Sequence, residues 1–70
     1  MKTIEINKQP IELYKILKFL GLASSGGEAK AVIANGQVGV NGIVELQKRK
    51  KIIHGDTIEF EGITYAVVFV

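Results

Sequence analysis

Four consecutive basic residues, Lys48 to Lys51, are the strongest candidates for chemistry in this chain of 70 residues. Lysine and arginine side chains that neutralise nucleic-acid phosphates release counterions, which provides most of the sequence-independent affinity for nucleic acids. Arg49 can donate a fork of hydrogen bonds to one phosphate or stack on a base, whereas Lys48, Lys50 and Lys51 act as mobile point charges. A run of like charges can also be a solvated surface without a ligand. The run is therefore the best functional candidate, although the composition alone favours the solvated surface over a phosphate-binding loop.

The positive excess of the chain is confined to this segment. Nine Lys and Arg residues against seven Asp and Glu residues give a formal net charge of +2 at pH 7. Without residues 48–51 the acidic residues outnumber the basic ones. The charge is thus a local patch, which is the distribution expected of a nucleic-acid contact.

The second candidate is a predicted helix start at Ser25, Gly26 and Gly27. Exposed N–H groups and the positive end of the helix dipole can hold a phosphate there, and the glycines allow close approach. Lys30, one turn later, could contact the same phosphate. The alternative for residues 25–27 is a flexible connector with a helix cap. The alternative for Lys30 is an ordinary surface lysine without a ligand. The spacing and the Gly-Lys-Ser/Thr ending of a nucleotide-binding P-loop are missing.

Catalytic and metal-binding chemistry is not indicated. His54 has no serine, cysteine or second histidine at a useful spacing, and its position before Gly55-Asp56 predicts a turn. The chain has no cysteine, and a single histidine cannot build a zinc site. We therefore predict no catalytic residue, no metal, no cofactor and no small-molecule substrate.

Three aromatic residues are candidates for stacking on bases, namely Tyr14, Phe19 and Tyr65. Tyr65 alternates with Ile63 and Val67 and is assigned to the core. Tyr14 and Phe19 lie at the edges of a helical apolar stripe. None of the three is included among the predicted binding residues.

Two helices must position these residues. Leu13, Ile16, Leu17 and Leu20 recur at helical spacing, Pro10 suits the first turn of that helix, and Gly21 ends it. A second helix starts near Gly26, because Ser25 and Glu28 have the spacing of a capping box, and it ends at Gly36. Its apolar stripe consists of Ala29, Val32 and Ile33. The short connection between the helices predicts that they pack at an angle.

The strands come mainly after the helices. Alternating apolar residues predict strands at 3–6, 38–40, 43–46 and 57–60, and the Asn41-Gly42 dipeptide predicts a tight hairpin turn. Residues 63–70 are apolar on both faces, which indicates a strand covered on both sides or well inside the sheet. The predicted fold class is α+β, a single domain with a two-helix corner packed on a small, mostly antiparallel sheet.

The sequence resembles the RNA-binding domain first described in ribosomal protein S-four, also called the αL motif. Within that family it is most similar to the small stand-alone bacterial members. The resemblance covers roughly residues 11 to 60 and rests on a combination of positions: Leu13, Leu17, Gly21, Ser25, Ala29, Ile33, Gly36, Val38, Val40, Asn41, Gly42, Gly55 and Asp56.

The resemblance implies that structured RNA, often ribosomal, lies against the second helix and neighbouring loops. Carried onto this chain, the implied contacts are Ser25, Lys30 and the basic loop, Lys48 to Lys51. The chain departs from the family pattern at Gly26 and Gly27, where the family usually has Arg directly after the serine, so this helix start would offer mainly backbone N–H groups. Glu12 likewise stands where many members are basic.

The sequence therefore predicts a non-enzymatic protein that binds structured RNA, with ribosomal RNA, an assembly intermediate or a ribosomal particle as the partner. The start of the chain lacks the order of a signal peptide, and no apolar run approaches the roughly 20 residues of a membrane span, so we expect a cytoplasmic protein without a membrane partner. An adaptor that binds an acidic protein is the alternative. DNA stays open as a ligand, because phosphate contacts do not distinguish the sugars.

Overall fold

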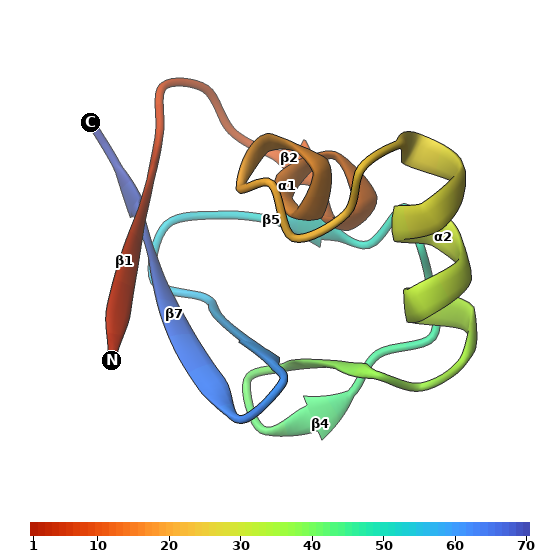
Figure 1. Ribbon diagram of the computed structural model, residues 1–70. Coiled ribbons are helices and arrows are strands. Elements are labelled where there is room, and N and C mark those ends of the chain that lie inside the picture. Colours follow the sequence, from red (N-terminus) through yellow and green to blue (C-terminus); the bar gives the residue numbers. More distant parts are fainter.

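Two helices pack as a corner above a sheet (Figure 1). The computed structural model describes all 70 residues. In chain order the elements are β1 (Lys2–Ile6), β2 (Ile11–Glu12), α1 (Leu13–Phe19), α2 (Gly26–Ala34), β3 (Val38–Val40), β4 (Ile43–Val44), β5 (Lys51–Ile52), β6 (Thr57–Phe60) and β7 (Ile63–Phe69). The predicted α+β class and the two-helix corner are confirmed. Neither helix is long and apolar enough to cross a membrane.

The main sheet has the strand order β1-β7-β6-β3-β4. β1 runs parallel to β7, and every other pair is antiparallel, which confirms the mostly antiparallel sheet. β7 lies between β1 and β6, so its apolar pattern on both faces correctly indicated an inner strand. A second sheet of two short antiparallel strands joins β2 to β5.

The core fills the space between the main sheet and the helices. All 15 buried residues are hydrophobic. The helices contribute Leu13, Ile16, Leu17, Ala29 and Ile33. The other two residues of the predicted apolar stripes, Leu20 and Val32, are partly buried and pack against this core. The main sheet contributes its inward-facing side chains, Ile4, Ile6, Val38, Val40, Ile58, Phe60, Tyr65 and Val67. Tyr65 is therefore a core residue, as predicted.

Two predicted elements differ in extent. Pro10 is not in the first turn of α1, because residues 11–12 form β2 and pair with β5, so the helix begins only at Leu13. The strand predicted over residues 43–46 ends at Val44. β3 is three residues long and pairs with only two residues of β4, after which the chain leaves the sheet edge to reach α1.

Local rules do account for α2 and the turn after β3. The Ser25 hydroxyl accepts a hydrogen bond from the backbone N–H of Glu28, at 3.1 Å. The other half of the predicted capping box is shifted by one residue, since the Glu28 carboxylate accepts from the N–H and the hydroxyl of Ser24 at 3.3 and 2.8 Å. Gly36 ends the helix at φ +75°, and Asn41 and Gly42 form the predicted hairpin turn with φ of 53° and 83°.

Candidate nucleic-acid interface

The basic loop, residues 48–51, is a tight turn followed by the start of β5. The N–H of Lys50 donates to the carbonyl of Gln47 at 3.1 Å, which places Lys48 and Arg49 at the tip of the turn. All four residues of the loop are exposed. The turn geometry thus directs the basic side chains outward into solvent.

The backbone of the basic loop is bonded to the start of α1. The N–H groups of Leu13 and Tyr14 donate to the carbonyls of Lys50 and Lys48 at 2.9 and 3.0 Å. Glu12, the N-cap residue of α1, makes no side-chain cap. The loop carbonyls therefore satisfy N–H groups that the first helical turn leaves free, and this bonding holds the loop beside α1.

Tyr14 lies at the point where α1, α2 and the basic loop meet. Its ring centroid is 4.7 Å from the Lys30 ammonium of α2, 5.3 Å from the Arg49 guanidinium carbon of the loop, and 5.9 Å from the Lys15 ammonium. These distances fall within the range of cation–π contacts. A methyl group added at Gly26 would meet the Tyr14 ring at 3.7 Å, so the ring also lies against the start of α2.

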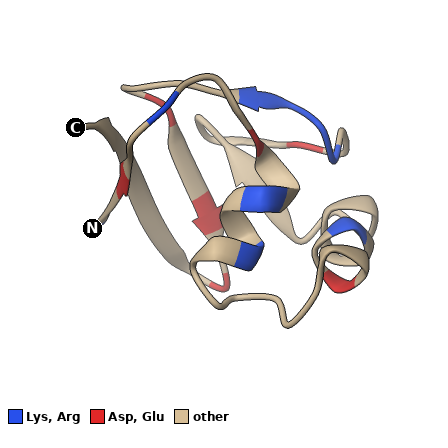
Figure 2. Ribbon diagram, turned by 90° about the horizontal axis from the view of Figure 1, so that it is seen from above, with Lys and Arg blue, Asp and Glu red and all other residues tan.

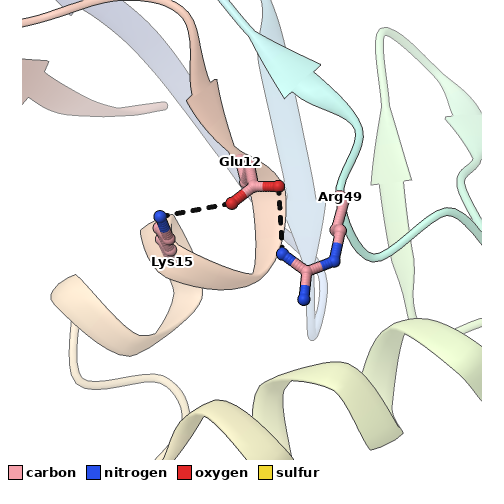
Figure 3. Close-up of polar contacts among 3 residues, drawn as sticks. All are labelled: Glu12, Lys15 and Arg49. Carbon is pink, nitrogen blue, oxygen red and sulfur yellow. Dashed lines mark hydrogen bonds and ion pairs between the residues drawn. The ribbon is translucent and has the colours of Figure 1, made fainter.

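Glu12 binds two of the cations around this ring. Its carboxylate oxygens lie 3.2 Å from the Lys15 ammonium and 3.2 Å from an Arg49 nitrogen (Figure 3). The hydrogen bond from Lys15, and after it that from Arg49, lower the pKa of the Glu12 carboxyl, partly opposed by desolvation. The hydrogen bond to Glu12 is the main cause that raises the pKa of Arg49. The acidic N-cap residue of α1 therefore orients an arginine of the basic loop.

The start of α2 presents unpaired backbone donors. The Ser25 hydroxyl already accepts from Glu28, whereas the N–H groups of Gly26 and Gly27 have no acceptor within the protein. A methyl group added at Gly27 would meet only the Ser25 hydroxyl, at 3.9 Å. These two N–H groups are therefore left without a protein acceptor, and N–H groups at the start of a helix can hold an anion.

Comparison with known proteins settles the family. The sequence matches the S4 domain over residues 4–68, nearly the whole chain. The chain belongs to the S4 domain family. The match is wider than the predicted 11–60, because it takes in most of β1 and β7.

Relatives of this S4 domain match almost the whole of this chain. A protein of Escherichia coli (strain K12) named "Putative RNA-binding protein YbcJ" is 46% identical over 69 residues, which cover 97% of this chain and 99% of the relative. The solution structure of YbcJ has a TM-score of 0.71 over 97% of this chain and 87% of that one, and is described as revealing an αL motif involved in RNA binding. The crystal structure of the 30S ribosomal protein S4e from Thermoplasma acidophilum is 32% identical with a TM-score of 0.74, over 91% of this chain and 34% of that one.

The fold of this S4 domain brings together only some of the predicted binding residues. Gly26, Lys30 and Arg49 meet around Tyr14. Lys48, Lys50 and Lys51 are exposed around them and form no ion pair. In Figure 2 the basic segment at β5 and the basic turn of α2 lie toward the same side of the molecule. No surface hollow is lined by residues of the basic loop, so the candidate interface is an open surface.

From the sequence, Tyr14 is a candidate only for stacking on bases, and it is not among the predicted binding residues. Tyr14 follows Leu13 at the edge of the helical apolar stripe. This position does not predict that Lys30 of α2 and Arg49 of the basic loop lie beside its ring. His54, in contrast, is the turn residue that was predicted. Its Nδ1 accepts from the N–H of Phe69 at 3.0 Å, and its own N–H donates to Gln9 at 2.9 Å.

Proposed function

We propose that this protein binds structured RNA through the surface formed by the basic loop, Tyr14 and the start of α2. The observation that carries the proposal is the convergence of Arg49 and Lys30 on the Tyr14 ring. The bonding of the loop backbone to α1 brings Arg49 there, and the packing of α2 against α1 brings Lys30. Three segments distant in sequence thus present one basic surface. The similarity to YbcJ, whose solution structure is described as having an αL motif involved in RNA binding, supports the same reading.

In this proposal the protein recognises shape and backbone charge, not base sequence. Lys48, Lys50 and Lys51 are exposed and free to contact phosphates, while the N–H groups at the start of α2 donate hydrogen bonds to a further phosphate. Double-stranded RNA is recognised mainly by such contacts. If about four to six phosphates are bound, log affinity falls with log salt by about 0.7 to 0.9 for each phosphate.

We further propose ribosomal RNA, free or in an assembling particle, as the partner. The fold and 32% identity shared with a 30S ribosomal protein support this choice. The protein acts there in the cytoplasm as a binding protein without a catalytic step. Crosslinking in cells followed by sequencing of the attached RNA tests the choice, and recovery of no ribosomal RNA above background would contradict it.

A charge-matched pair of variants tests the surface. Lys48→Gln/Lys50→Gln removes two charges from the basic loop, and Lys2→Gln/Lys8→Gln removes two from β1 and the connector after it. Binding to a folded ribosomal RNA fragment is measured over a range of salt, with a DNA duplex as competitor. We expect the loop variant alone to lose affinity and to show a smaller salt slope. Equal losses in both variants would mean that net charge, not this surface, governs binding.

One observation favours a second function, an adaptor for an acidic protein. β4 is an edge strand, and its residues Ile43 and Val44 are 73% and 61% exposed. An exposed strand edge can pair with a strand of another protein, while the basic loop would contact acidic side chains. Displacement of a native protein partner by an acidic protein but never by RNA would favour the adaptor over the RNA-binding protein.

A further inference from the structure

Two cations of the proposed interface share one aromatic ring although they come from different segments. Lys30 belongs to α2 and Arg49 to the basic loop, and their charged groups lie within 5.3 Å of the Tyr14 ring centroid. Long basic side chains lose rotamer freedom when they bind a ligand. A ring that restricts both before binding reduces that loss.

Tyr14 is itself held in place from several sides. Its N–H donates to the carbonyl of Lys48, its ring lies against Gly26, and its neighbour Leu13 is fully buried. The Tyr14 and Lys30 side chains are half-buried and Arg49 is exposed, so solvent can reach the cations around the ring. Tyr14 thus combines a fixed backbone with a surface that a ligand can approach.

Arg49 keeps free donors in this arrangement. One of its nitrogens is 3.2 Å from a Glu12 oxygen, and a guanidinium has five N–H donors. Lys30 forms no ion pair at all. Both cations can therefore donate to an incoming phosphate without first breaking every bond that orients them.

We propose that Tyr14 is a positioning residue that holds Lys30 and Arg49 as a preformed clamp for the phosphodiester backbone of RNA. This inference rests on the proposed function and adds a specific part to it. The clamp consists of Lys30, Arg49 and the ring between them. RNA backbone enters between the start of α2 and the basic loop, and the aromatic ring contributes by ordering the cations, not by stacking on a base.

The test compares Tyr14→Leu with Tyr14→Phe. Both variants keep the charge of the protein, but only phenylalanine keeps an aromatic ring for the cations. We expect Tyr14→Leu to weaken binding of a folded ribosomal RNA fragment about tenfold, because two side chains must now be ordered on binding, and Tyr14→Phe to stay within about twofold of the unaltered protein. The salt slope should be the same in all three proteins, since the number of phosphates bound does not change.

A double-variant cycle separates positioning from a general structural role. In an Arg49→Gln/Lys30→Gln background the further change Tyr14→Leu should cost little affinity, because neither cation of the clamp remains for the ring to order and Lys15, the third cation near the ring, is bound to Glu12. A full tenfold loss in that background, or an equal loss in Tyr14→Phe, would overturn the inference. Failure of the unaltered protein to bind RNA would overturn the proposed function instead.

A measurement on the unaltered protein covers the case in which Tyr14→Leu does not fold. Side-chain NMR of Lys30 and Arg49 should show restricted motion and ring-current shifts in the absence of RNA, while Lys18, exposed on α1, serves as the mobile reference. Side chains of Lys30 and Arg49 as mobile as that of Lys18 would contradict the preformed clamp.

Discussion

The two helices of this protein begin in different ways. At α1 the first N–H groups, those of Leu13 and Tyr14, donate to carbonyls of the basic loop, and the N-cap residue Glu12 makes no side-chain cap. At α2 a serine caps the helix locally and two glycine N–H groups are left without an acceptor. The first helix start is occupied by the protein's own chain, whereas the second is open to a ligand.

In the proposed function, the domain uses one helix start for structure and the other for binding. The occupied start of α1 fixes the basic loop in place, and the open start of α2 lies next to it across the Tyr14 ring. Neither helix start alone would make an interface. Substitutions at the two starts should therefore have effects of different kinds, on stability at α1 and on ligand binding at α2.

The largest effect is expected from Leu13→Ala at the start of α1. Leu13 is fully buried, and truncation of a buried leucine costs about 2 to 5 kcal/mol of unfolding free energy. Phe19→Ala on the same helix is the control, because Phe19 is 73% exposed and should cost less than about 0.5 kcal/mol. Urea unfolding followed by circular dichroism measures both. Similar losses in the two variants would mean that α1 is not anchored through its start.

Removal of the α2 cap should have a smaller effect on stability. Ser25→Ala loses the hydroxyl that accepts from the Glu28 N–H, and such caps contribute about 1 kcal/mol. Ser25→Asp restores a cap but adds a negative charge at the open helix start. We expect urea unfolding to show recovered stability in Ser25→Asp and RNA titration to show weaker binding. Unimpaired RNA binding by Ser25→Asp would place the phosphate away from this helix start.

Gly27→Ala should separate stability from binding at the same place. The added methyl group has room, and alanine favours a helix over glycine by up to about 1 kcal/mol, so the variant should be slightly more stable in thermal unfolding. The methyl group also lies beside an unpaired N–H, so affinity for RNA should fall. Ala34→Gly at the other end of α2 is the control, with lower stability and unchanged affinity. A gain in both properties for Gly27→Ala would show that backbone approach is not needed there.

The sequence allowed α2 and its neighbours to be predicted because their determinants are local. Ser25 caps α2 by accepting from an N–H three residues away, and Gly36 ends the helix. Asn41-Gly42 forms the hairpin turn between adjacent strands. Each of these rules acts over a few residues. The helix, the turn and the inward-facing positions of the strands could therefore be assigned without knowing the rest of the fold.

The start of α1 could not be predicted in this way because its partners are distant in sequence. The pairing of β2 with β5 displaced the helix start from Pro10 to Leu13, which overrode a local rule about proline. The pair between Glu12 and Arg49 joins residues 37 positions apart. Tyr14 was missed for the same reason, since only the folded chain brings Lys30 and Arg49 to its ring. The individual basic residues were predicted, but the way they converge was not.

Glu12→Gln should have the smallest effect, visible mainly as a change in pH dependence. The pKa of Glu12 is lowered in the folded protein, so its ion pairs add stability above the ordinary carboxyl pKa, and that contribution is lost as the pH falls through the lowered value. Thermal unfolding of both proteins between neutral pH and about pH 3 should therefore show an advantage of the unaltered protein that shrinks in acid. It should shrink also in high salt, because the pairs are exposed.

Comparing the two proteins removes the contribution of all other carboxyl groups, which titrate in both. An advantage that persists unchanged in acid would mean that Glu12 does not bind its cations as a carboxylate. The start of α1 would then depend only on the buried Leu13 and the loop carbonyls. The contrast with α2 would become sharper, because the polar groups at the start of α1 would be satisfied by distant backbone alone, whereas those at the start of α2 are capped by a neighbouring side chain.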